Sequence, residues 1–173
     1  MTQTHRIYSY GYLMMAAGAA HERAQILAKA DKEPFIDSLN TVLHCALALE
    51  AFMNHLGAQA MPHWTPLKRK LSPVEKLETL AAHGSLQIDW SKSPYQSFKE
   101  AMTFRNLIVH AETEDVEAPG DSHEDHPQTK WQSFCTMNRA GRILTDTKDI
   151  IANLPGQLNL ESIPSFLLTE RTE

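Results

Sequence analysis

Long segments with helical spacing of apolar residues, separated by turns that contain proline, constrain this 173-residue chain more than any other feature. Proline lacks an N–H donor and clashes with the preceding helical turn, so each of these turns is expected to end a helix. On this basis the sequence predicts five helices, over residues 12–30, 35–58, 73–83, 95–113 and 129–153.

Local signals mark several of these helix ends. Ser72, Pro73 and Glu75 have the spacing of a capping box with proline at the first helical position. Gly84 follows that helix, where we expect it to supply a left-handed cap. At the other end of the chain, Leu154-Pro155-Gly156 predicts the stop of the fifth helix.

The connections favour an all-α fold. The alternating stretch at residues 86–90 is too brief to build a sheet, and no other segment is typical of a strand. Five helices with mostly short connections predict an antiparallel bundle over residues 1–155. Residues 156–173 are expected to be a C-terminal tail whose apolar patch, residues 163–168, docks on the bundle or on a partner.

Composition limits the class of protein. With 42% hydrophobic and 21% charged residues, the chain is typical of a soluble globular domain. The net charge of −5 argues against a broad, non-specific nucleic-acid surface. Cys45 and Cys135 stand in apolar segments without a CxxC partner, so we expect two buried reduced thiols in a cytoplasmic protein, with a disulfide as the alternative. The apolar stretch at residues 13–20 is too short for a membrane span, so no membrane is expected as a partner.

The predicted fourth helix, residues 95–113, has two faces that differ in chemistry. With Ala101 at zero and about 100° per residue, an apolar stripe lies between about 240° and about 340°. We expect this stripe to face the core; it contains Phe104, Leu107, Ile108 and Ala111, with Phe98 beside it. The opposite face is mixed and should line a groove or pack on a partner; it contains Met102, Arg105, Asn106, Val109 and His110.

Arg105, Asn106 and His110 are residue types that suit phosphodiester cleavage in RNA. Arginine matches phosphate oxygens, histidine exchanges a proton near neutral pH, and asparagine can orient the imidazole. The 2′-hydroxyl would attack the adjacent phosphorus while His110 moves a proton and Arg105 stabilises the anionic transition state, with no metal or other cofactor. The alternative is a surface salt bridge and a packed imidazole.

The separation of Arg105 and His110 bears on how such a site would form. Five residues along a helix amount to about 7.5 Å of rise and about 140° of rotation, so the two side chains do not meet on the helix surface. They would converge if Arg105 curled around the helix or if a second copy of the helix supplied the complementary residue, as in an isologous dimer.

The segment from Phe104 to Glu112 resembles the signature of the HEPN (higher eukaryotes and prokaryotes nucleotide-binding) superfamily. That signature is an arginine, a polar residue that is usually asparagine, a few further residues and a histidine, on a late helix. Residues 47–54, which include Glu50, resemble the second-helix stretch of that superfamily, and residues 73–77 resemble the short helix that follows. The resemblance covers about residues 12–153.

The resemblance implies a helical bundle that dimerises through the motif helices and often acts as a metal-independent endoribonuclease. Toxin–antitoxin and defence systems are typical hosts, so the implied partners are RNA, a second copy, and an antitoxin or nucleotidyltransferase-like protein. The alternative is a non-catalytic module of the same superfamily that binds a partner protein or a nucleotide. The intact set of Arg105, Asn106 and His110 favours the enzyme.

Three further groups have two interpretations each. Glu50 is either a carboxylate at the edge of a helix or a buried partner for Arg105 or His110. The basic run of Lys68, Arg69 and Lys70 is either a solvated surface or a site for RNA phosphates. The third group is either a solvated acidic loop, which we favour, or a metal site; it contains Asp121, His123, Glu124, Asp125 and His126.

Overall fold

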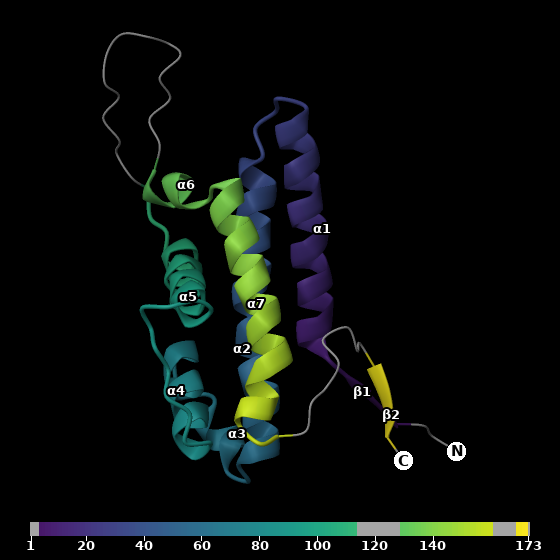
Figure 1. Cartoon of the computed structure of the whole chain (residues 1–173), viewed down its shortest axis with the longest axis vertical. Helices are drawn as coiled ribbons and strands as arrows, with labels where there is room; N and C mark the ends of the chain where they lie inside the picture. The colour runs from purple at the N-terminus through teal and green to yellow at the C-terminus, as the bar shows by residue number, and fades with distance from the viewer. Residues whose placement is uncertain (1–3, 114–128, 161–168, 173) are drawn as a thin grey trace.

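The computed structural model describes residues 4–113, 129–160 and 169–172, which form seven helices and two short strands (Figure 1). The all-α prediction is confirmed for this part of the chain, apart from one small ribbon. Five of the helices are longer than ten residues, as expected, and two are single turns. The elements are Thr4–Ile7 (β1), Ser9–Lys29 (α1), Phe35–Ala60 (α2), Trp64–Leu67 (α3), Pro73–His83 (α4), Tyr95–Val109 (α5), Lys130–Phe134 (α6), Met137–Gln157 (α7) and Thr169–Thr172 (β2).

Helix α2 is the centre of the bundle and contacts α1, α4, α5 and α7. Its buried residues include Leu49, Phe52, Met53 and Leu56. At its C-terminal end the backbone of Gly57 lies directly against the Trp64 ring of α3, where a Cβ atom would come within 2.0 Å of the ring. The absence of a side chain at residue 57 therefore allows α3 to close the lower end of the core.

The directions of the long helices differ in part from the predicted antiparallel bundle. Helices α1 and α2 run antiparallel, but α7 runs in the same direction as α2 (Figure 1). The reason is that the shorter α4 and α5 together carry the chain from one end of α2 back towards the other, beside the long helices. Helix α7 then starts again at the end where α2 began.

The apolar character of α2 extends over 26 residues, which makes it long and apolar enough to cross a bilayer by length and composition alone. The sequence-based prediction about a membrane span rested only on the shorter apolar stretch at residues 13–20, which lies in α1. In the fold, α2 packs against five other helices, and this central position accounts for its apolar composition.

The two thiols are buried and free, as predicted. Burial raises the pKa of Cys45 to about 12, and that of Cys135 to about 12 as well. Both are therefore protonated at neutral pH and belong to the apolar core.

The prediction that no segment forms a strand is wrong at the chain ends. Strand β1 pairs antiparallel with β2, with Thr4 opposite Thr172 and Ile7 opposite Thr169. Four residues per strand give too little alternation to be recognised from sequence, and the partner is more than 160 residues away along the chain. Part of the C-terminal tail therefore pairs with the N-terminal segment.

The ends of α4 confirm one predicted cap and correct another. Ser72 and Glu75 form the predicted capping box, with Ser72 N to Glu75 Oε2 at 2.7 Å. Gly84 has a φ of −87°, and Ser85 takes the left-handed conformation with a φ of 56°. Gly84 has another function, because a Cβ there would lie 2.6 Å from Cδ2 of Leu158.

Helix α7 extends one turn beyond the predicted stop and ends at Gln157. Pro155 lies inside its last turn, where a missing N–H removes only one helical hydrogen bond. The left-handed residue that ends the helix is Asn159, with a φ of 55°, and the N–H of Leu160 donates to the carbonyl of Pro155 at 2.9 Å. The predicted domain boundary at residue 155 therefore falls within α7.

Candidate functional site

Helix α5 faces the core along a different arc from the predicted one. Phe98 and Phe104 are buried as expected, but Ala101 and Met102 are buried too, while Leu107 is 37% exposed. The buried arc is thus rotated by roughly a quarter turn from the predicted stripe. The reason is that α5 packs against α2, α4, α6 and α7 rather than against one neighbour.

This rotation places Arg105 on the inner side of α5, where it meets Glu50 of α2. Arg105 Nη2 lies 3.4 Å from Glu50 Oε2. The predicted pairing of these two residues is confirmed, and the interpretation of Glu50 as a carboxylate facing only water is wrong. Arg105 is 28% exposed, so its guanidinium is held by the protein and still reaches the surface.

Lys76 of α4 is a third member of the cluster, and sequence analysis missed it. Its Nζ donates to Glu50 Oε1 at 2.9 Å, and its side chain is only 3% exposed. The signal was available, because Lys76 falls on the apolar stripe of α4 formed by Pro73, Leu77 and Leu80. A charged residue on a core-facing stripe needs a buried partner.

Two cations share one carboxylate in this cluster, which leaves Glu50, Lys76 and Arg105 together with a net positive charge. Arg105 Nη1 also donates to Asn106 Oδ1 at 3.0 Å, while Arg105 Nε is buried and has no hydrogen-bond partner in the described part of the chain. The arginine is therefore fixed in place with donor capacity to spare. An arrangement of this kind can bind an anion such as a phosphate group.

His110 lies outside the helix, because α5 ends at Val109 rather than near residue 113. His110 is the C-cap residue and is exposed, and its backbone N–H donates to the carbonyl of Asn106 at 3.1 Å. Among the described residues, no hydrogen bond or ion pair joins the imidazole to Arg105, Asn106 or Glu50. One protomer thus brings Arg105, Asn106 and Glu50 together and leaves His110 apart from them.

A polar clamp between α5 and α7 sets the rotation of α5 about its axis. The carboxylate of Asp146 accepts a hydrogen bond from Ser93 at 2.6 Å and one from Ser97. Arg142 donates to Ser97 Oγ and to Glu100 Oε2, each at 2.7 Å. Asp146 and Ser97 are both buried, so this network holds one side of α5 on α7 and directs its other side towards α2.

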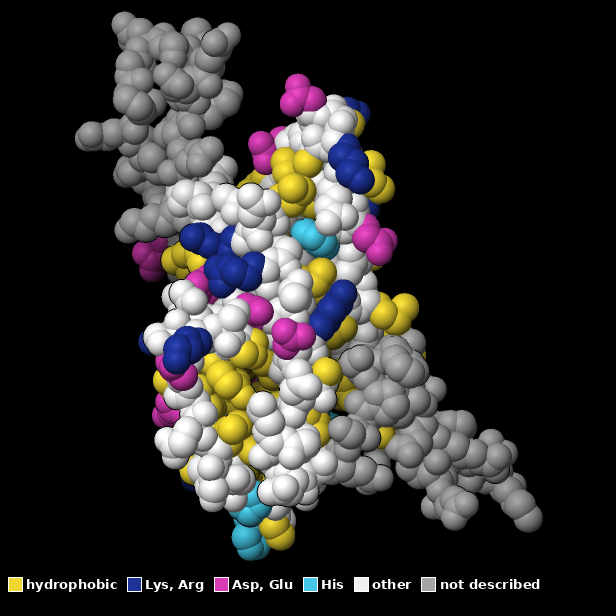
Figure 2. Space-filling model, in the orientation of Figure 1, with side chains coloured by type: hydrophobic (Ala, Val, Ile, Leu, Met, Phe, Trp, Pro, Cys, Tyr) yellow, Lys and Arg dark blue, Asp and Glu magenta, His cyan; other side chains and the backbone are white. Residues whose placement is uncertain are grey.

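The predicted RNA-binding run forms no hydrogen bond or ion pair with the described residues of this cluster. Lys68 is the C-cap of α3, and Arg69 and Lys70 are exposed in the turn before α4. None of the three forms an ion pair with a described residue. On the face shown in Figure 2, basic and acidic side chains are interspersed, in keeping with the net charge of −5.

The predicted acidic cluster, Asp121 to His126, lies outside the described residues. Within the described ranges, no group of three or more His, Cys, Asp or Glu side chains is arranged to hold a metal ion.

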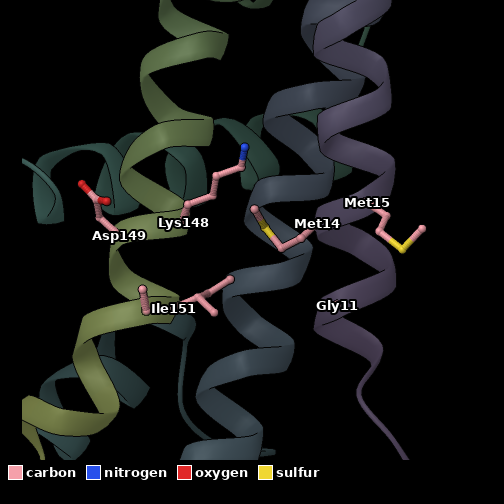
Figure 3. Close-up of a pocket in the computed structure, with 7 residues that line it drawn as sticks. Gly11, Met14, Met15, Lys148, Asp149 and Ile151 are labelled. Atoms are coloured by element: carbon pink, nitrogen blue, oxygen red, sulfur yellow. The ribbon is translucent and has the colours of Figure 1, made fainter. Parts of the chain in front are cut away.

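A separate cavity of about 390 Å³ lies between α1 and α7 (Figure 3). Met14 and Ile151 give it an apolar wall, and Lys148 extends from α7 towards α1. Its described lining residues belong to α1 and α7, whereas the cluster is formed by α2, α4 and α5.

Comparison with known proteins gives no relative: no protein-family model, no curated protein and no solved structure matches this chain. Any proposal about function therefore depends on the geometry of the described residues and on the motif in α5.

Proposed function

We propose that this protein is a metal-independent endoribonuclease of the HEPN type that acts as a symmetric dimer. The observation that carries the proposal is the placement of Arg105: it is held by Glu50 and Asn106 and remains accessible at the surface. An arginine positioned in this way is suited to the anionic transition state of phosphoryl transfer.

In the proposed reaction, an imidazole takes the proton from the 2′-hydroxyl of the RNA, and the oxygen attacks the adjacent phosphorus. The bond between phosphorus and the 5′-oxygen breaks, and that oxygen leaves with a proton from solvent water. His110 supplies the base. Arg105 stabilises the charge that develops on the phosphate oxygens. The products are a 2′,3′-cyclic phosphate and a 5′-hydroxyl.

The surface around His110 supports a dimer. Leu107 is 37% exposed and Val109 is 58% exposed, and both lie at the end of α5 next to His110. Apolar side chains beside a polar residue on one exposed helix end favour an interface with a partner. A two-fold axis near this end of α5 would bring two copies of the Arg105–His110 motif together.

The experiment is incubation of the purified protein with end-labelled RNA in EDTA, beside His110→Ala and Arg105→Ala. His83→Ala is the matched control, because His83 is an exposed histidine at the end of another helix, α4. We expect cleavage by the wild type and by His83→Ala, none by the other two variants, and none of DNA, which lacks the 2′-hydroxyl. Cleavage that needs Mg²⁺, or that persists in both variants, would contradict the proposal.

Toxin–antitoxin or defence activity in the cytoplasm is the biological role that we propose for such an enzyme. A partner that covers the end of α5 near Val109 and His110 would then silence it, which is how an antitoxin or a nucleotidyltransferase-like protein would act.

A binding module is the second candidate, and one observation favours it. Glu50 neutralises part of the charge of Arg105, and a carboxylate 3.4 Å from the guanidinium competes with a phosphate for the same donors. In this case the cluster would hold a nucleotide or a partner protein without chemistry. Binding of RNA without any cleavage in the experiment above would select this candidate.

A further inference from the structure

A second cavity, of about 310 Å³, opens where the chain enters α1 and meets α2. Tyr8 and Tyr10 line it from the start of α1, and Ala51, Asn54 and His55 line it from α2. Its volume lies at the lower end of the range for small-molecule sites, about 300–1,000 Å³.

Two polar atoms of residues at this cavity, Tyr10 Oη and Asn54 Oδ1, have no hydrogen-bond partner among the described residues. The hydroxyl of Tyr10 is buried, in a side chain that is only 1% exposed, and Oδ1 of Asn54 is buried as well. Buried polar atoms in proteins are nearly always paired, and an unpaired one destabilises the folded state. Both atoms belong to residues that line the cavity, although each atom itself has less than 1 Å² of accessible surface.

The protonation state of Tyr10 is suited to the donor role. Burial, together with the neighbouring Tyr8, raises the pKa of Tyr10 to about 12. The hydroxyl thus keeps its proton across the neutral range and can donate it in a hydrogen bond.

Three of the seven described residues that line the cavity are aromatic: Tyr8, Tyr10 and His55. The ring of Tyr8 lies edge-on to Tyr10, with centroids 5.8 Å apart, and edge-on to His55, with centroids 5.2 Å apart. A flat heteroaromatic group with an acceptor and a donor on its edge fits such walls and the two unpaired atoms. Nucleobases have this chemistry.

The cavity is also close to the candidate catalytic cluster. Asn54 follows Glu50 by four residues on α2, so their Cβ atoms are about 5–6 Å apart on one side of the helix. A base held by Asn54 would thus be next to a phosphate held by Arg105, as in one nucleotide of an RNA chain.

We infer that this cavity is a nucleobase subsite, which holds one base of the RNA whose phosphate lies at Arg105. The inference rests on the proposed ribonuclease function and adds the part of the substrate that the enzyme recognises. Tyr10 donates to the base edge, and Oδ1 of Asn54 accepts from it.

Binding is tested without cleavage, by titrating the full-length protein with each of the four nucleoside 5′-monophosphates and with ribose 5-phosphate as a control that lacks the base. Calorimetry gives the affinity, and NMR locates the contact. At least one nucleotide should bind more tightly than ribose 5-phosphate and shift the signals of Tyr8, Asn54 and His55.

The matched variants are Tyr10→Phe and Tyr12→Phe. Tyr10→Phe keeps the buried ring and removes only the unpaired hydroxyl, so the affinity for the preferred nucleotide should fall by about five-fold, the loss of one hydrogen bond. Tyr12 is exposed on the same helix and does not line the cavity, so Tyr12→Phe should bind like the wild type.

The outcomes separate the subsite from the ribonuclease. The subsite would be overturned if ribose 5-phosphate bound as tightly as the nucleotides, or if Tyr10→Phe bound the preferred nucleotide as tightly as the wild type. It would also be overturned if water filled the cavity and no nucleotide displaced it. RNA cleavage that depends on His110 could still occur in that case. Conversely, base-dependent binding that is retained in His110→Ala supports the subsite whether or not the wild type cuts RNA.

Discussion

Glu50 and Arg105 are 55 residues apart in sequence and 3.4 Å apart in the fold, and their contact joins the central helix to the helix with the candidate motif. The same carboxylate also holds the buried Lys76 of α4. Glu50 is therefore the single acceptor for two cations on two helices, and changes at this one side chain should affect both stability and function.

Glu50→Gln should lower the free energy of unfolding by about 1–3 kcal/mol, because Lys76 then keeps a buried charge with only a neutral amide as its partner. Urea denaturation measures the change. Glu78→Gln is the control, since Glu78 is exposed on the same helix as Lys76, and it should stay within about 0.5 kcal/mol of the wild type. Equal stability of the two variants would show that the ion pair contributes nothing.

The contact between Gly57 and Trp64 gives a test of the core. Gly57→Ala places a Cβ within 2.0 Å of the indole ring, so α3 must shift, at a cost of about 1–3 kcal/mol. Gly18→Ala is the opposite case, because nothing lies within 4 Å of the new Cβ in the middle of α1. It should stabilise the protein by about 0.5–1 kcal/mol. Thermal unfolding of both variants tests this difference in sign.

His21 should make stability dependent on pH. Burial lowers its pKa in the folded protein below the ordinary 6.5, and nearby Lys148 lowers it further, against a smaller opposite effect of Glu22. A histidine with a lowered folded pKa favours the folded state above its unfolded pKa, and this contribution is lost as the pH falls. Between about pH 7.5 and about pH 5.5, the wild type should therefore lose more stability than His21→Gln. An equal loss of unfolding free energy in the two proteins between these two pH values, measured by urea denaturation, would refute this.

The sequence predicted where the helices lie along the chain better than it predicted which contacts they and the chain ends make. Helical spacing and proline located all five long helices, because these signals are local. The orientation of α5 was wrong by about a quarter turn, since it depends on the clamp between Ser97 and Asp146, whose members are 49 residues apart. Likewise, the pairing of β1 with β2 depends on contacts between the chain ends.

The candidate site was predicted in part for the same reason. Arg105, Asn106 and Glu50 were recognisable from the motif and from an isolated charge on an apolar helix. Lys76 was missed, although a lysine on an apolar stripe gives the same kind of signal as Glu50. The end of α5 at Val109 was missed too, because no glycine or proline marks it.

The exposed end of α5 predicts how a dimer would be disrupted. Val109→Lys should shift the protein from dimer to monomer in sedimentation velocity at micromolar concentration, because it puts a charge at the proposed interface. Ile26→Lys is the control, since Ile26 is similarly exposed on α1, away from the motif. A wild type that is monomeric at all micromolar concentrations, or equal effects of the two variants, would contradict an interface at this end of α5.

The last prediction concerns which protomer supplies each residue. Arg105 points towards Glu50 on the inner side of α5, and His110 is exposed beyond the end of the helix, with no described contact between them. We therefore expect each active site to combine Arg105 of one protomer with His110 of the other. Arg105→Ala and His110→Ala homodimers should both be inactive, but a mixture of the two should regain activity. Random exchange makes about half of the dimers mixed, and each mixed dimer has one intact site of two, so about a quarter of wild-type activity should return.

Adding Val109→Lys to both variants should abolish the recovery by preventing exchange into dimers. If the mixture stays inactive while a dimer forms, each site is built within one protomer, and Arg105 must then reach His110 around its own helix.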